Sequence, residues 1–134
     1  MKLVSYIFPI YNETDNIDLL YKTMASLLKK HKQYNYELIF VNDGSRDDSL
    51  DKLLALQKKD RRITVVDFAR NFGHQIAVTA GLDHAKGDAI IIMDSDMQDP
   101  PKVSFELLEK WEEGYDVVYA QRRTRKDTFF KRFT

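Results

Sequence analysis

Residues 89–99 read AIIIMDSDMQD, an apolar run that ends in acidic and amide side chains. The first five residues are typical of a strand that is buried on both faces of a sheet. The run stops at Asp94-Ser95-Asp96, so two carboxylates follow directly after the predicted strand. In open parallel sheets, ligands bind beyond the carboxyl ends of the strands, and this end is therefore a candidate site.

Further apolar runs of strand length lie on both sides of this stretch, separated by segments of helical periodicity. The other strands are expected at Leu3–Phe8, Tyr36–Val41, Ile63–Phe68 and Asp116–Ala120. Apolar i, i+3, i+4 spacing predicts helices over Ile17–Leu28, from Leu50, over Gly73–Ala85 and from Pro100 to Trp111. Ser45 and Asp48 are expected to cap the helix that contains Leu50. The alternation predicts an α/β fold, a mostly parallel sheet with helices on both faces.

Length and composition exclude several classes of protein. The chain has 134 residues, enough for one modest domain, and 43% hydrophobic with 31% charged residues is typical of a globular protein. The absence of cysteine excludes a disulfide framework, thiolate metal sites and a cysteine nucleophile. No apolar run reaches the roughly 18 residues that a membrane-spanning helix needs. The N-terminus is predicted to form the first strand rather than a signal peptide.

The net charge of zero conceals an uneven distribution. Residues 122–134 carry a net charge of +5, which leaves −5 on residues 1–121. An acidic body is not the charge pattern of a nucleic-acid-binding domain, so no nucleic-acid partner is predicted. We expect the body to hold a cation and the basic end to meet phosphate or an anionic membrane surface. Phe129, Phe130 and Phe133 among basic residues predict the start of an amphipathic helix there.

Asp94 and Asp96 are the predicted ligands of a divalent cation. Carboxylates at i and i+2 after a strand can both reach one hard ion, and Mg²⁺ or Mn²⁺ bound in this way keeps coordination sites for phosphate oxygens. The ion would bridge the two phosphates of a nucleoside diphosphate and neutralise the charge of that leaving group. The alternative is an aspartate-rich turn without a ligand, but the position after a buried strand favours the metal site.

Polar residues after the first two strands belong to the same sheet edge. Glu13 and Asp43 add carboxylates whose repulsion a cation or a hydrogen-bonding ligand would relieve. Asp43 is a candidate acceptor for a base or ribose, and Tyr11 is a candidate to stack on a base. The alternatives are a turn residue for Asp43, a helix-start residue for Glu13 and a packing aromatic for Tyr11.

Two arginines that follow strands are candidates for binding phosphate. Arg70 comes after the third strand and Arg122 after the fifth. Close to Arg70, His74 or Gln75 is a candidate for binding a sugar hydroxyl, with a polar loop and helix cap as the alternative for this segment. The chain has no GxGxxG and no Walker loop, which weighs against a dinucleotide enzyme or an NTPase.

Taken in order, these motifs resemble the family 2 glycosyltransferases, and more narrowly the branch that glycosylates polyprenyl phosphates. The matching segments are Pro9–Glu13, Val41–Ser45, Arg70–Gln75, Asp94–Pro101 and Tyr119–Arg123, which together span nearly the whole chain. The resemblance implies the Rossmann-like A-type glycosyltransferase fold. It also implies a metal-dependent, inverting hexosyltransferase of the cell envelope, which moves a sugar from a UDP- or GDP-linked donor to undecaprenyl or dolichyl phosphate.

The resemblance, with the candidates above, gives a full set of predicted site residues. The nucleotide-sugar site is predicted to contain Pro9, Tyr11, Asn12, Glu13, Asp43, Arg70, Asp94, Ser95 and Gln98. The metal is predicted to be held by Asp94, Asp96 and Gln98. The predicted catalytic residues are Asp94, Asp96 and Arg122, the last by contact with phosphate near the acceptor. Asp-Ser-Asp-Met stands where Asp-Ala-Asp-Leu is commoner in the family, a conservative difference.

The same resemblance sets the expected organisation. Residues 1–121 would form the nucleotide-sugar-binding domain, and residues 122–134 the truncated start of an acceptor loop or membrane-proximal segment. Proteins of this branch add interfacial helices and often two membrane spans, so the parent is expected at the cytoplasmic face of a membrane and this fragment in solution. We expect the fragment to bind donor and metal and to transfer sugar poorly or not at all. The donor base and sugar, the preferred metal and a homo-oligomeric state are left open.

Three other functions compete with this interpretation. One keeps the fold but transfers the sugar to a hydroxyl of a cell-wall or capsular polysaccharide, which requires a catalytic carboxylate beyond Thr134. Another is a nucleotide-binding module without turnover. A haloacid-dehalogenase-type phosphotransferase also uses Asp-x-Asp, but that family places the motif after the first strand, where this chain has Pro9-Ile10-Tyr11.

Overall fold

The computed structural model describes residues 1–98, 100–115, 117–122 and 128–133, and the side chains up to residue 115. The chain divides into two compact units, residues 1–99 and residues 100–134. The predicted division at residue 121 stays a prediction. Across the described residues, none of the helices combines the length and apolar character that crossing a bilayer would require.

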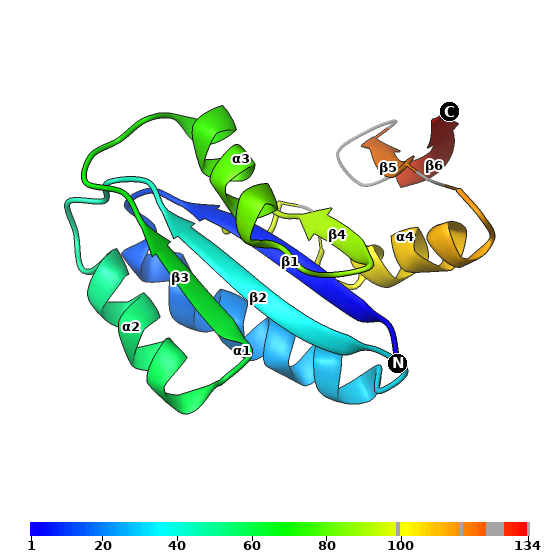
Figure 1. Ribbon diagram of the computed structural model, residues 1–134, viewed down its shortest axis with the longest axis horizontal. Coiled ribbons are helices and arrows are strands. Elements are labelled where there is room, and N and C mark those ends of the chain that lie inside the picture. The colour runs from blue at the N-terminus through cyan, green and yellow to red at the C-terminus, as the bar shows by residue number, and fades with distance from the viewer. Residues whose placement is uncertain (99, 116, 123–127, 134) are drawn as a thin grey trace. The chain divides into compact units, whose positions relative to one another are not determined.

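The first unit contains a parallel sheet with strand order β3-β2-β1-β4 (Figure 1). The strands are β1 (Leu3–Ile10), β2 (Asn35–Asn42), β3 (Ile63–Asp67) and β4 (Ala89–Ile92). The central strand β1 pairs with β2 along its whole length and with β4 over Val4 to Ile7. The order reverses between β1 and β4, which is the point where sheets of this kind bind ligands. The predicted α/β fold with a parallel sheet is therefore confirmed.

Three helices connect these strands, α1 (Thr14–Lys30), α2 (Ser49–Lys59) and α3 (His74–His84). Figure 1 shows α1 and α2 on one face of the sheet and α3 on the opposite face. Both faces of the central strands β1 and β2 are therefore covered, which explains why they are nearly continuous apolar runs in the sequence. The burial on both faces expected for Ala89–Met93 is wrong, because β4 is an edge strand whose Ile90 and Ile92 are 42% and 46% exposed. An aromatic row runs along the sheet, in which Phe8 stacks on Tyr6 and on Phe40 with ring centroids 6.1 and 5.0 Å apart.

The helix α3 packs closely over the middle of the sheet. Its Ala77 is fully buried in a cluster with Ile7, Ile39 and Val41. One turn further along, a Cβ atom at Gly81 would lie 2.5 Å from Cγ2 of Ile7. The absence of a side chain at Gly81 therefore sets how near α3 lies to β1, and so fixes the position of the start of α3 above the carboxyl edge.

The second unit contains α4 (Val103–Glu112) and a two-stranded sheet of β5 (Val117–Arg122) and β6 (Thr128–Phe133). The strand expected near residue 117 is present, but it pairs antiparallel with β6, from Val117↔Phe133 to Arg122↔Thr128. The amphipathic helix predicted after residue 128 is wrong, because this segment is the strand β6. Periodicity cannot separate helix from strand in so short a run, and threonine and phenylalanine both favour strands.

Candidate functional site

The carboxyl edge of the parallel sheet gathers the predicted site loops. They follow β1 at Tyr11, β2 at Asp43, β3 at Phe68 and β4 at Met93. Because all four strands run in the same direction, these loops meet at one edge, where α1, α2 and α3 also begin (Figure 1). The sequence pattern therefore predicted the correct edge for the loops of residues 1–98.

The loops after β1 and β2 are joined by reciprocal hydrogen bonds at Asn12. The backbone N–H of Asn12 donates to Oγ of Ser45 at 2.9 Å, and the N–H of Arg46 donates to Oδ1 of Asn12 at 2.8 Å. Asn12 has φ 51°, a conformation that asparagine tolerates better than most residues. The Asn12 side chain thus shapes the loop, and its predicted contact with a nucleotide stays a prediction. The capping role expected of Ser45 is wrong, since α2 has no side-chain cap and Ser45 accepts from Asn12.

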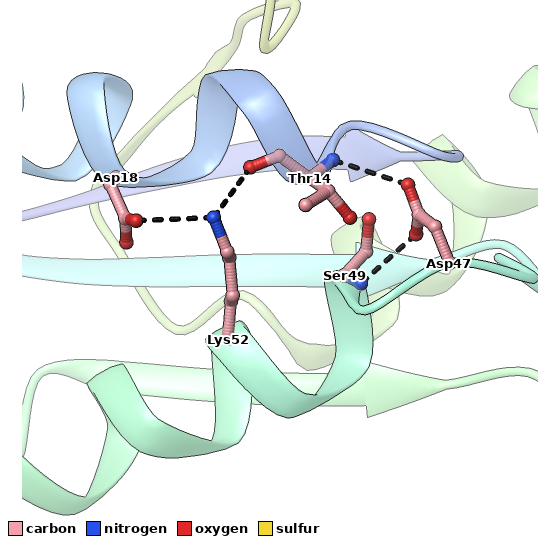
Figure 2. Close-up of polar contacts among 5 residues, drawn as sticks. All are labelled: Thr14, Asp18, Asp47, Ser49 and Lys52. Carbon is pink, nitrogen blue, oxygen red and sulfur yellow. Dashed lines mark hydrogen bonds and ion pairs between the residues drawn. The ribbon is translucent and has the colours of Figure 1, made fainter.

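A second set of contacts joins the first turns of α1 and α2 (Figure 2). The carboxylate of Asp47 accepts from the N–H groups of Thr14 at 3.3 Å and Ser49 at 2.9 Å. Lys52 Nζ donates to the carbonyl of Thr14 at 2.9 Å and lies 3.2 Å from Oδ2 of Asp18. Desolvation would raise the pKa of Asp47, but the hydrogen bonds from Ser49 and Thr14 lower it to about 2. Asp47 is therefore ionised at neutral pH and holds the two helix starts together.

The remaining predicted residues of the first loop differ in exposure. Pro9 lies half-buried within β1, whereas the Tyr11 side chain is 45% exposed just beyond the strand. Glu13 is partly buried, and its Oε2 accepts from Nδ2 of Asn16 at 2.6 Å, while its N–H donates to Oγ of Ser49 at 3.0 Å. Of this loop, Tyr11 is the side chain best placed for contact with a ligand.

Asp43 is buried and faces the loop that follows β3. Only 4% of its surface is exposed. Its carboxylate accepts from the N–H of Phe72 at 2.7 Å, the N–H of Gly73 at 3.1 Å and Nδ2 of Asn71 at 3.0 Å. The predicted contact of Asp43 with a base or ribose stays a prediction, and the structure adds a contact that the sequence did not suggest.

Arg70 is exposed and stacks on a neighbouring ring. Its guanidinium carbon lies 4.5 Å from the centroid of Phe72, which in turn meets Phe68 edge-on at 5.5 Å. Stacking leaves the N–H groups at the rim of the guanidinium able to donate to an anion. The predicted role of Arg70 in binding phosphate is compatible with this arrangement.

The Asp94–Gln98 segment after β4 forms a tight turn. The N–H of Met97, which has φ 55°, donates to the carbonyl of Asp94 at 3.4 Å, and the N–H of Gln98 donates to Oδ1 of Asp96 at 3.2 Å. Ser95 is buried between Asp94 and Asp96, both of which are exposed. A positive φ at a residue other than glycine is a form of backbone strain found more often at functional sites.

His74, the first residue of α3, reaches the predicted metal ligand. Its Nε2 lies 3.5 Å from Oδ1 of Asp94, and both side chains are 64% exposed. Among the described residues, no three histidine, aspartate or glutamate side chains come close enough together to hold a metal ion. The four predicted carboxylates share an edge but do not form one cluster, because Asp43 faces the loop at residues 71–73 and Glu13 faces Asn16.

The residues at this turn nevertheless fit a divalent ion of the predicted kind. Mg²⁺ is usually bound through one or two carboxylates, with phosphate oxygens and water completing its shell. Asp94 and Asp96 are two exposed carboxylates separated by one residue, and the Gln98 side chain is exposed in the same turn. Gln98 and the two carboxylates thus remain the predicted ligands.

The predicted phosphate ligand Arg122 lies in the second unit. Arg122 is the last residue of β5, and its side chain lies outside the described part of the chain. Its predicted contact with phosphate stays a prediction.

Sequence reasoning missed several residues that shape the edge. Asp47, Ser49, Lys52 and Asn71 received no role, although they bind loops that carry predicted site residues. Aspartate and serine just before a helix are a usable signal for such contacts. Lys52 and Asn71 carried no local signal, because their partners lie 38 and 28 residues away.

The chain matches the model of one protein family, described as glycosyl transferase family 2, over residues 5–134. It is 50% identical over 131 residues to an uncharacterized glycosyltransferase, YkcC, of Bacillus subtilis, a match that covers 97% of this chain and 40% of that protein. It is 43% identical over 122 residues to a prophage bactoprenol glucosyl transferase homolog of Escherichia coli, covering 91% of this chain and 40% of the relative. The chain thus spans about two fifths of the length of these relatives.

Solved structures share the fold. A mannosyltransferase of Pyrobaculum calidifontis in complex with GDP-Man and Mn²⁺ matches with a TM-score of 0.60 at 23% identity, over 69% of this chain and 27% of that one. Staphylococcus aureus TarS 1–349 in complex with UDP matches with a TM-score of 0.62 at 23% identity, over 82% and 32% of the two chains. At this level of identity the likeness shows the fold alone, and it confirms the predicted Rossmann-like A-type fold.

Proposed function

The chain belongs to glycosyl transferase family 2, and from this premise we propose that it is the donor-binding part of a hexosyltransferase that glycosylates a polyprenyl phosphate. The observation that carries the proposal is the 43% identity to bactoprenol glucosyl transferases over 91% of the chain. Bactoprenol is a polyprenol, so the acceptor in the names of these relatives agrees with the acceptor that the family resemblance implied.

The donor is proposed to bind at the switch point between β1 and β4. Tyr11 follows β1, and the exposed carboxylates of Asp94 and Asp96 follow β4. A nucleoside placed against Tyr11 would direct its diphosphate toward the turn at Asp94, because the two strands are neighbours in the sheet. Arg70 and the start of α3 would border the phosphates, where a guanidinium and a helix N-terminus both favour negative charge.

A divalent cation is proposed at the same turn. Asp94, Asp96 and Gln98 would hold Mg²⁺ or Mn²⁺, which when bound supplies positive charge to the departing diphosphate. The Pyrobaculum mannosyltransferase contains Mn²⁺ together with GDP-Man, which supports this choice of ion. The neighbouring structures hold GDP-Man in one case and UDP in another, so both bases are tested as donors below.

The proposed reaction needs little proton transfer from the protein. An oxygen of the acceptor phosphate is already ionised at neutral pH, so it can attack the anomeric carbon without a strong general base. A bond forms from that oxygen to the anomeric carbon as the bond to the nucleoside diphosphate breaks, which inverts the configuration. The protein would then act by placing the two phosphate groups, with Arg122 reducing the repulsion between acceptor and donor.

The acceptor and the basic end of the chain together point to a membrane surface. A polyprenyl chain is retained in a bilayer, so its phosphate is met at the interface. The +5 charge of residues 122–134 would attract that segment to anionic lipid. We propose that the parent protein works at the cytoplasmic face of the membrane.

Calorimetric titration of this chain with UDP and with GDP, each with and without Mn²⁺, tests the donor proposal. We expect one of the two nucleotides to bind, and to bind more tightly in the presence of Mn²⁺. Failure of both nucleotides to bind a folded sample would contradict the donor site for this chain.

The acceptor is tested separately on the full-length parent. We expect transfer of labelled sugar to undecaprenyl phosphate and none to undecaprenol, which has the same lipid chain but lacks the phosphate. Equal transfer to a soluble polysaccharide would favour a sugar hydroxyl as the acceptor instead.

A further inference from the structure

We infer that Asp43 is a positioning residue, whose carboxylate fixes the backbone at residues 71–73 and so sets His74 beside Asp94. The predicted role of this residue was direct contact with a nucleoside. The geometry points to an additional role in the ligand-free protein, in which Asp43 holds the loop at residues 71–73. Through this loop the end of β2 is connected to the turn after β4.

The hydrogen bonds of Asp43 carry the first step. A carboxylate has about four lone-pair positions, and three donors from Asn71, Phe72 and Gly73 already occupy the carboxylate of Asp43. Nδ2 of Asn71 also donates to the backbone carbonyl of Asp43 at 3.1 Å. With 4% of its surface exposed, Asp43 offers little area to a ligand but holds three consecutive residues of the loop.

The neighbouring glycine shows how closely the two loops approach. A Cβ atom at Gly44 would lie 2.2 Å from the carbonyl carbon of Arg70 and 2.3 Å from the backbone nitrogen of Asn71. Gly44 also has φ 69°, in the region that favours glycine. The backbone after β2 therefore lies directly against the backbone after β3, and Asp43 holds them together.

The second step follows from where the fixed segment ends. Gly73 is the N-cap of α3, and His74 is the first residue of that helix. Nε2 of His74 lies 3.5 Å from Oδ1 of Asp94. Because β2 and β4 flank β1, a change at Asp43, directly after β2, can reach the turn after β4 through the start of α3. The importance of Asp94 as a metal ligand comes from the proposed function, and this second step rests on it.

Hydrogen exchange of the ligand-free chain tests the first step. Asp43→Asn replaces one acceptor oxygen by an NH₂ group, which then faces a donor. Since hydrogen bonds to a charged group are the stronger ones, we expect the amides of Phe72 and Gly73 to exchange about tenfold faster or more. Wild-type protection of both amides in a folded Asp43→Asn variant would overturn the inference.

Two further variants distinguish the loss of the hydrogen bonds between Asp43 and residues 71–73 from a general loss of stability. Asn71→Ala removes one donor and leaves the carboxylate intact, so we expect a smaller increase at Gly73, which shares the same oxygen. Asp67→Asn is the matched control, a carboxylate at the end of β3 that accepts from Asn42 rather than from the loop. It should leave the amides of Phe72 and Gly73 unchanged. A rise of equal size in this control would also overturn the inference.

Titration with Mn²⁺ alone tests the second step without a nucleotide. Asp43→Asn and His74→Ala should each lower Mn²⁺ affinity by about tenfold, the size typical of residues that orient a metal ligand. The double variant should lose no more than either single one, since both act through the same contact. Additive losses would overturn the route through His74. If wild type does not bind Mn²⁺, the proposed metal site fails. The positioning role of Asp43 is then still decided by amide exchange at Phe72 and Gly73 and by the NMR shift of the His74 ring protons in Asp43→Asn.

Discussion

The amino and carboxyl edges of the parallel sheet carry similar charged residues but use them differently. At the amino edge, Asp60 is 8% exposed and accepts from Nε and Nη2 of Arg62 at 2.9 and 2.7 Å. The Tyr21 hydroxyl donates to the same carboxylate at 2.9 Å. Nearby, Glu37 accepts from the Ser5 hydroxyl at 2.5 Å. These groups satisfy one another within the fold.

At the carboxyl edge the carboxylates after β4 remain largely open to solvent. The Asp94 side chain is 64% exposed, and its contact with His74 is long at 3.5 Å. Asp96 accepts from the N–H of Gln98 at 3.2 Å and is otherwise exposed. Aspartate and glutamate thus stabilise the fold at Asp60 and Glu37, where their partners are internal, and stay available for a ligand at Asp94 and Asp96, where their partners are weak.

The largest loss of stability is expected at Gly44 on the carboxyl edge, where the backbone of a neighbouring loop leaves no room for a side chain. Gly44→Ala would combine a strained φ with a Cβ atom 2.2 Å from backbone, so we expect it to lower the free energy of unfolding by about 4 kcal/mol or more. Urea denaturation measures this loss. Gly73→Ala is the matched control, because its φ is also positive but no heavy atom lies within 4 Å of the added Cβ. An equal loss in both variants would mean that strain alone, rather than close approach, decides the cost.

Replacing an aspartate by asparagine at each edge sharpens the contrast. At the carboxyl edge, Asp94→Asn should lower the affinity for nucleotide in the presence of Mn²⁺ by about 100-fold, or about 2.7 kcal/mol. Its urea midpoint should match that of wild type, because the side chain is mostly exposed. Calorimetry measures the affinity. Unchanged binding of nucleotide and metal would show that Asp94 is not a metal ligand.

At the amino edge, Asp60→Asn should lower the stability of the fold and leave the nucleotide affinity unchanged, the opposite of Asp94→Asn. Asp60→Asn weakens charge-assisted hydrogen bonds in a buried position, so we expect a loss of about 2 kcal/mol in the free energy of unfolding with nucleotide affinity unchanged. Hydrogen bonds from the Arg62 side chain, opposed by burial and helped by the Arg62 N–H and Tyr21, lower the pKa of Asp60 to about 2.

This lowered pKa gives the stability difference between wild type and Asp60→Asn a defined pH dependence. The stabilisation is fully present above the unfolded pKa of about 3.9 and is lost as the pH falls toward about 2. Urea midpoints of the two proteins should therefore converge below about pH 4. A difference that stays constant down to pH 2 would contradict the assigned cause.

The smallest effect is expected at the contact between the starts of α1 and α2. Lys52→Met keeps the aliphatic stem but removes the donor to Thr14 and the ion pair with Asp18 (Figure 2). Such partly exposed pairs contribute little, so we expect a loss of about 0.5 kcal/mol in the urea-derived stability. A salt titration is the control, since the difference should shrink as ionic strength rises. A loss of more than about 2 kcal/mol in the free energy of unfolding would contradict this expectation, because a loss of that size is typical of a buried ion pair.

The sequence predicted the sheet, its edge and the motifs on that edge because these depend on local pattern. Apolar runs such as Leu3–Phe8 and Tyr36–Val41 reveal buried strands without knowledge of their neighbours. Polar residues that follow such runs then lie together at one edge, because the strands are parallel. The family resemblance rests on the same local segments, and the family match confirmed it.

The sequence could not predict the hydrogen-bond partners of the loop residues, because these depend on which loops contact one another. Ser45 looked like a helix cap, but its partner is the N–H of Asn12, which lies 33 residues away. Asp43 looked open to a ligand, but its partners lie 28 to 30 residues further along the chain. Such contacts follow from the order of the strands and from the close approach at Gly44, and neither is written in a local pattern. The strand at residues 128–133 was missed because its pairing with β5 also decides its form.

Most donors that join the loops of the carboxyl edge are backbone N–H groups, and this sets how much each position can vary. Glu13 and Phe72 contribute N–H groups, which any residue except proline would also supply. Ser49 and Asp43, their acceptors, contribute side-chain oxygens that few residues replace. We therefore expect a library of variants to accept many residues at 13 and 72 and very few at 43 and 49, so that the loops could be given new surface chemistry while their shape is retained.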